Sequence, residues 1–221
     1  MKVGIEVVTG FLGAGKSAFI NSLINKTKAV GEKIIVLTCE SGNVKIKELE
    51  ENDITVKHID FIENNSELNG EIYKIVKEYK PHRIIIEYNG TETLEHLYRC
   101  IFDNETGKLI KLNTMYFVCD GDSLDFYIKN MGELLLPFIQ SSDVLVINNC
   151  YKLSEEKIEE DIDLLGTLNH KAQIIKSNNN EDFEKALDES KLLENNFLRN
   201  MRVKIIDYMR KWVSRWESEY K

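Results

Sequence analysis

The sequence predicts an α/β fold with a mostly parallel central sheet and helices on both of its faces. Short apolar runs rich in Val and Ile recur along the chain, and amphipathic helical patterns separate most of them. This alternation is typical of a parallel sheet that is buried on both sides. The predicted strands are Val3–Val8, Lys33–Thr38, Ile54–Ile59, His82–Glu87, Thr114–Cys119, Asp143–Asn148 and Ala172–Lys176.

The segment after the first strand is a phosphate-binding loop. Residues 9–17 read TGFLGAGKS, which contains the GxxxxGK[ST] motif between a predicted strand and a helix that opens at Ser17. Glycines let successive backbone N–H groups converge on phosphates at the positive helix N-terminus. We expect Lys16 to contact the outer phosphates and Ser17 to bind Mg²⁺. The predicted nucleotide-binding residues of this segment are Gly10, Gly13, Ala14, Gly15, Lys16, Ser17 and Ala18.

The fourth predicted strand ends in an acidic residue that suits the same site. It reads HRIIIEYNG, so Glu87 closes the strand and Gly90 follows three residues later. An acid here can organise Mg²⁺ and water, and the Gly90 N–H can face a terminal phosphate. The alternative is that Glu87 merely ends a strand. Asp120, just after the fifth strand, is a second acid on the same predicted edge.

Composition restricts the class of protein. With 221 residues and 43% hydrophobic content, the chain can form a single domain over 1–221. The net charge of -8 argues against nucleic acid as a partner, because phosphate backbones need clustered Lys and Arg. No apolar run approaches the roughly 20 residues that span a bilayer, and the N-terminus enters a strand directly. We therefore expect a cytoplasmic protein without a transmembrane segment.

The four cysteines are widely separated and form no CxxC pair. Three of them, Cys39, Cys119 and Cys150, lie at or just beyond predicted strand ends, where α/β proteins bind ligands. A composite metal site is one interpretation. Buried free thiols are the interpretation that the spacing favours.

The last 25 residues predict a C-terminal amphipathic helix over 197–221. Apolar residues recur there every three or four positions, which favours packing against the sheet. The segment carries seven basic and three acidic residues, so a partner or membrane-surface role is the alternative.

Three motifs in order resemble the CobW-type GTPases, relatives of the nickel chaperones HypB and UreG. They are TGFLGAGKS at the first loop, VLTCESGNV at residues 36–44 and IIIEYNG at residues 84–90. By this resemblance Glu40 and Gly42 match a switch segment, Glu87 and Gly90 match an ExxG motif, and Asn148 matches the first residue of NKxD. The resemblance, over roughly residues 1–178, implies GTP/GDP or ATP/ADP with Mg²⁺, a client or partner protein, and a possible homodimer.

Two departures from that family pattern bear on function. Family members of the zinc-chaperone type carry a CxCC motif between the switch segment and ExxG, but residues 43–86 contain no cysteine. The NKxD element appears as residues 148–151, NNCY, with Tyr151 in place of the aspartate that reads guanine. Loss of a hydrogen bond to a charged group removes about 1.5–3 kcal/mol of discrimination. The preferred base, guanine or adenine, is therefore open.

Three functions remain at this stage. The first is a Mg²⁺-dependent NTP hydrolase that acts on a partner in metal or metallocofactor delivery, with Lys16, Glu40 and Glu87 as catalytic candidates and Ser17, Glu40 and Glu87 as metal ligands. The second is a nucleotide-binding regulatory or scaffold module with little turnover, which the altered NKxD motif suggests. The third is a small-molecule kinase, which is disfavoured because Arg83 and Arg99 are isolated in the sequence.

Overall fold

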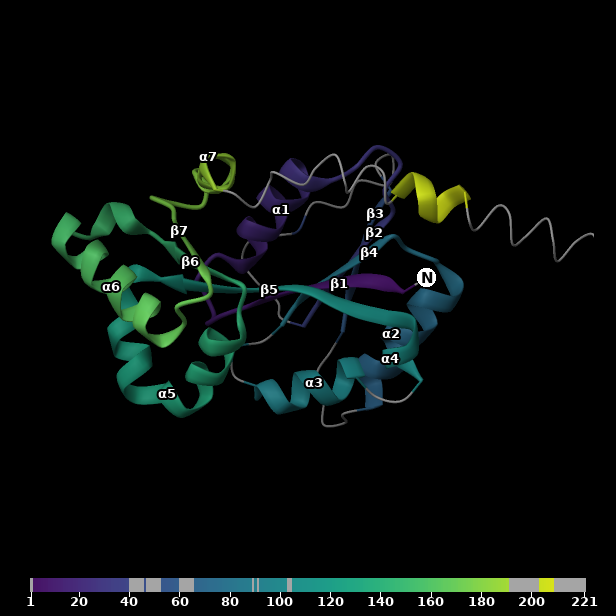
Figure 1. Ribbon diagram of the computed structural model, residues 1–221, viewed down its shortest axis with the longest axis horizontal. Coiled ribbons are helices and arrows are strands. Elements are labelled where there is room, and N and C mark those ends of the chain that lie inside the picture. The colour runs from purple at the N-terminus through teal and green to yellow at the C-terminus, as the bar shows by residue number, and fades with distance from the viewer. Residues whose placement is uncertain are drawn as a thin grey trace, which may run out of the picture.

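The fold is known from a computed structural model, which describes residues 2–39, 46, 53–59, 66–88, 90, 92–102, 105–190 and 203–208 (Figure 1). The strands are β1 (Val3–Thr9), β2 (Ile34–Thr38), β3 (Ile54–His58), β4 (Arg83–Glu87), β5 (Ile110–Asp120), β6 (Val144–Asn148) and β7 (Gln173–Lys176). The helices are α1 (Lys16–Thr27), α2 (Ser66–Glu78), α3 (Leu94–Phe102), α4 (Thr106–Leu109), α5 (Leu124–Ser141), α6 (Glu155–Leu168) and α7 (Phe183–Glu189), with 3₁₀ turns η2 (Gly121–Ser123) and η3 (Cys150–Lys152).

The strands form one seven-stranded sheet in the order β3-β2-β4-β1-β5-β6-β7, and every ladder is parallel. The predicted α/β fold class is therefore confirmed. The main difference lies in β5, which begins at Ile110 rather than Thr114 because residues 110–112 pair with the start of β1. A register shift between Ile5 and Glu6 accommodates the longer strand.

Side chains alternate between the two faces of the sheet and form two apolar cores. One core lies beneath α1 and α7, where Phe19 and Phe183 meet edge to face at 5.5 Å. The other lies beneath α2, α3, α5 and α6 and includes Ile72, Leu97 and Phe138. Figure 1 shows α1 and α7 on one side of the sheet and α2, α3, α4 and α5 on the other. Both faces are covered, as burial of parallel strands requires.

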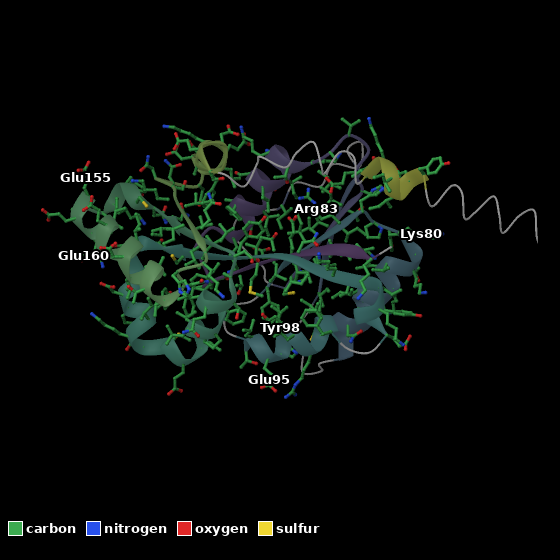
Figure 2. All side chains as sticks on the ribbon, viewed as in Figure 1. Lys80, Arg83, Glu95, Tyr98, Glu155 and Glu160 are labelled. Carbon is green, nitrogen blue, oxygen red and sulfur yellow. The ribbon has the colours of Figure 1, made fainter. Side chains whose placement is uncertain are left out.

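A buried ion cluster lies at the start of β4, far along the strands from the predicted site. Arg83 is 3% exposed and pairs with Glu6 at 3.3 Å and with Glu32 at 3.2 Å. Burial opposes the charge of Arg83, but the two carboxylates outweigh it and raise the pKa of the guanidinium. Figure 2 shows Arg83 inside the protein, whereas Glu95 of α3 and Glu155 of α6 lie on the outside.

Residues 203–208 form a helical turn that contacts the sheet domain. Val203 and Ile206 are buried, while Ile205 and Tyr208 are exposed. The backbone N–H of Lys33 donates to Nδ1 of His82, so the Nε2 proton donates to Asp207 at 2.7 Å. The rest of the predicted helix over 197–221, and the proposed single domain over 1–221 that includes it, extend outside the described residues. Among the helices described, none is long and apolar enough to cross a membrane.

Candidate nucleotide site

The loop between β1 and α1 has the backbone form that its glycines predict. Gly10 and Gly15 have φ values of 137° and 100°, in the region that side chains other than glycine rarely adopt. A Cβ at Gly10 would also lie 1.9 Å from the Val118 carbonyl oxygen of β5, so no side chain fits there. Helix α1 begins at Lys16, directly after this turn. Its N-terminus therefore meets the loop, as an anion site requires.

Lys16 lies inside the loop rather than in solvent. Its ammonium group donates to the carbonyl oxygens of Gly10 and Phe11, each at 2.9 Å, and the residue is 4% exposed. The positive charge is thus held where the phosphates are predicted to lie. Its role with nucleotide stays a prediction.

Ser17 and Glu87 come together from opposite parts of the sequence. The Ser17 hydroxyl donates to Oε1 of Glu87 at 2.6 Å, and both residues are buried. The contact forms because β1 and β4 are neighbours, with Val8 beside Glu87 in the register. A hydroxyl and a carboxylate are hard oxygen ligands of the kind that Mg²⁺ prefers. Two of the three predicted metal ligands, Ser17 and Glu87, therefore form one cluster with suitable chemistry.

The ExxG segment also touches the phosphate loop. A Cβ on Gly90 would lie 2.4 Å from the carbonyl oxygen of Gly10, so the two backbones approach closely. The end of β2 lies on the other side of β4, where the Cys39 N–H donates to the Glu87 carbonyl oxygen at 3.0 Å. Glu40 and Gly42 lie outside the described residues, and their roles stay predictions.

Asn148 joins the phosphate loop to the far side of the site. Its Nδ2 donates to the Ala14 carbonyl oxygen at 2.9 Å and to Oδ1 of Asn180 at 2.8 Å. The sequence did not single out Asn180, because residues 177–182 read as an ordinary polar loop. Its signal was three successive asparagines after the seventh predicted strand. Asp120, treated as supporting, accepts from Nδ2 of Asn149 at 2.6 Å.

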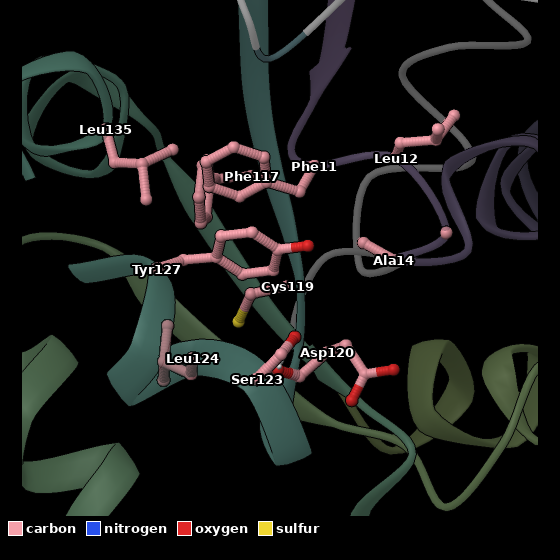
Figure 3. A pocket seen from close by; sticks show the side chains of 11 residues that line it. Phe11, Leu12, Ala14, Phe117, Cys119, Asp120, Ser123, Leu124, Tyr127 and Leu135 are labelled. Carbon is pink, nitrogen blue, oxygen red and sulfur yellow. Dashed lines mark hydrogen bonds between the residues drawn. The ribbon is translucent and has the colours of Figure 1, made fainter. Parts of the chain in front are cut away.

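A pocket of about 180 Å³ lies beside the phosphate loop (Figure 3). Its walls come from Phe11 and Leu12 of the loop, Cys119 of β5, and Leu124 and Tyr127 of α5. The rings of Phe11 and Tyr127 stack at 3.9 Å. This contact fixes the outer side of the loop against α5.

The four cysteines are buried. Their side chains are reduced thiols, and burial raises the pKa of Cys100, Cys119 and Cys150. Within the part of the chain that the structure describes, no group of three or more His, Cys, Asp or Glu side chains is arranged to hold a metal ion. A composite thiol site gains no support from these residues.

Solved structures of other proteins share this fold. Zn(II)-bound YjiA GTPase from E. coli has a TM-score of 0.60 and 19% identity, over 79% of this chain and 57% of that one. The hydrogenase maturation factor HypB from Archaeoglobus fulgidus has a TM-score of 0.58 and 18% identity, over 91% and 90% of the two chains. At these identities the likeness shows the fold alone.

Sequence comparison identifies the family. The zinc-regulated GTPase metalloprotein activator 1 of Dictyostelium discoideum is 25% identical over an alignment of 219 positions, which includes 80% of this chain. The chain spans about half the length of that relative, 46%. The family model described as CobW/HypB/UreG, nucleotide-binding domain, matches residues 5–176. The chain therefore belongs to the CobW/HypB/UreG family of P-loop NTPases and contains its nucleotide-binding domain.

Proposed function

We propose that this protein binds and hydrolyses a nucleoside triphosphate with Mg²⁺, and that the nucleotide state controls a partner protein in metal or metallocofactor delivery. The observation that carries the hydrolase part is the 2.6 Å contact between Ser17 and Glu87 next to Lys16. It unites the phosphate loop and the ExxG strand in one site.

The proposed mechanism is mostly positioning. The loop N–H groups and the α1 N-terminus bind the phosphates. Lys16 exchanges its bonds to the Gly10 and Phe11 carbonyls for bonds to phosphate oxygens. Ser17 and Glu87 hold Mg²⁺, which when bound neutralises charge on the phosphates. Glu40 is proposed as the second acid that organises the metal or the attacking water.

The partner role is supported by the names of relatives. One is a metalloprotein activator and another a hydrogenase maturation factor. From these names we propose that this chain acts in delivery of metal or a metallocofactor to a client protein. A homodimer that closes the site is part of the same proposal.

The test is phosphate release by the full chain with GTP and ATP, with and without Mg²⁺. We expect slow hydrolysis that needs Mg²⁺, falling by about 100-fold or more in Lys16→Ala and Glu87→Gln, because each removes charge stabilisation of the transition state. Lys74→Ala is the matched control, since Lys74 is exposed and forms an ion pair with Glu71 of its own helix. Nucleotide binding that does not depend on Lys16 would contradict the proposal.

The second candidate is a nucleotide-binding regulatory or scaffold module with little turnover. It is favoured by Tyr151, which occupies the position of a base-reading aspartate and is 64% exposed. Tight, Lys16-dependent binding without measurable phosphate release, even with partner proteins present, would support this function over hydrolysis.

A further inference from the structure

The loops after β6 and β7 form the side of the site where a nucleotide base belongs. The Cys150 and Tyr151 N–H groups donate to the carbonyl oxygens of Ser177 and Asn178, so the two loops are tied together. They reach the phosphate loop through Asn148. Glu87 and Gly90 occupy the opposite flank, which is the proposed metal and terminal-phosphate side. A nucleotide with its phosphates in the loop therefore places its base toward the β6 and β7 loops.

The side chain of Asn148 holds these loops together and does not contact a base. Its amide nitrogen has two protons, and both are used, on the Ala14 carbonyl and on Asn180. The Ala14 contact fixes which end of the amide is nitrogen, because a carbonyl oxygen only accepts. The residue is 0% exposed, and its Oδ1 is buried without a hydrogen-bond partner. Nothing on Asn148 is left to donate to a purine.

Two neighbouring side chains are also engaged in holding the loops. Asn149 is bonded to Asp120, and Asn179 caps the N–H groups of Glu181 and Asp182. Guanine presents two adjacent donors, N1–H and the 2-amino group, which a carboxylate accepts together. Adenine presents an acceptor and a donor on the same edge. Tyr151 carries an aromatic ring where a carboxylate would make this choice, and the π-face of either purine stacks on such a ring.

We propose that Tyr151 is the base-contacting residue of this site, and that the chain binds adenine and guanine nucleotides with affinities within about tenfold of each other. This inference rests on the proposed function, since it names the substrates of the same site. Asn148 is a positioning residue: it holds Ala14 and Asn180 for whichever base is bound.

The experiment is calorimetric titration of the full chain with GDP and with ADP in the presence of Mg²⁺. Tyr151→Asp restores an acceptor pair and is expected to raise the GDP-to-ADP affinity ratio by about 10- to 100-fold. Tyr151→Leu removes the ring and should weaken both nucleotides by about fivefold or more without changing the ratio. Asn148→Ala should also weaken the binding of GDP and ADP, and by the same factor for each. Melting curves verify that each variant is folded.

The outcomes distinguish failure of the proposal about Tyr151 from failure of the proposed function. A wild-type preference of 100-fold or more for either base would overturn the proposal, and so would an unchanged ratio in Tyr151→Asp or unchanged affinities in Tyr151→Leu. In each of those cases Lys16-dependent nucleotide binding would still stand. Failure of both nucleotides to bind, or binding unaffected by Lys16→Ala, would instead refute the proposed function itself.

Discussion

Replacing Gly90 with alanine tests whether the ExxG loop and the phosphate loop work as one packed unit. Alanine differs from glycine here by one Cβ, which must fit between the two loops. The effect of the change is therefore steric. The new Cβ would lie 2.4 Å from the Gly10 carbonyl oxygen and 2.7 Å from its carbon.

The size of the effect follows from those distances. Both obstructing atoms are backbone, so the loops must separate by about 0.6 Å to reach the 3.0 Å limit of real Cβ contacts. Overpacking of this kind costs about 1–3 kcal/mol. For a domain of this size each kcal/mol lowers the Tm by about 2–4 °C, so we expect a fall of about 2–12 °C. Displacement of Gly10 also moves the carbonyl that Lys16 contacts. We therefore expect nucleotide affinity to fall by about tenfold or more.

Thermal denaturation and nucleotide titration measure the two effects in the same preparation. Gly70→Ala is the matched control, because Gly70 lies in α2 and a Cβ there meets nothing within 4 Å. Alanine in that helix should stabilise the protein by up to about 1 kcal/mol. If Gly90→Ala melted with Gly70→Ala and bound nucleotide as the wild type does, the close approach of the two loops would be refuted.

Three further predictions concern buried polar groups. Arg83→Met should destabilise the protein by about 3–5 kcal/mol in chemical denaturation, because Glu6 and Glu32 lose their cation; an unchanged midpoint would contradict this. Burial raises the pKa of Asp161, so its folded form keeps a proton that the unfolded chain has lost, and this contribution to stability falls as pH rises above 3.8. Asp161→Asn should therefore gain stability relative to the wild type as the pH rises above about 3.8, measured by chemical denaturation at several pH values; an equal pH dependence of the two proteins would contradict this. Alkylation at pH 8 should be slow until denaturant is added, as followed by mass spectrometry, and fast native labelling would argue against burial of the thiols at Cys39, Cys100, Cys119 and Cys150.

The sheet was predictable because each strand carries its own signal. Runs such as Ile84–Ile86 are apolar on both faces, which only a strand covered on two sides tolerates. The early start of β5 was missed because Lys111 and Asn113 interrupt its apolar run, and pairing with β1 decides it. The order of the strands in the sheet could not be predicted from the hydrophobic pattern either, since it depends on contacts between distant segments.

In the candidate site too, some residues could be predicted from the sequence and others could not. The phosphate loop could be predicted because its glycines and Lys16 lie within one short segment. Glu87 could be predicted because it ends an apolar strand. Asn180 could not be found this way. Its role depends on meeting Asn148, 32 residues away in sequence, through the adjacency of β6 and β7. Polar residues in a loop carry no periodic signal, so their partners emerge only when the chain is folded.

The bonds from Lys16 to its own loop have a kinetic consequence. The ammonium already has two oxygen partners, at Gly10 and Phe11, and those carbonyls hold the turn in shape. In the proposed role of Lys16, an incoming phosphate therefore replaces partners of a side chain that is already in position. Arrival can then be fast, since little conformational entropy is lost on the way in. Release returns the lysine to the same two oxygens, which stabilises the emptied loop and favours exchange of product for fresh nucleotide.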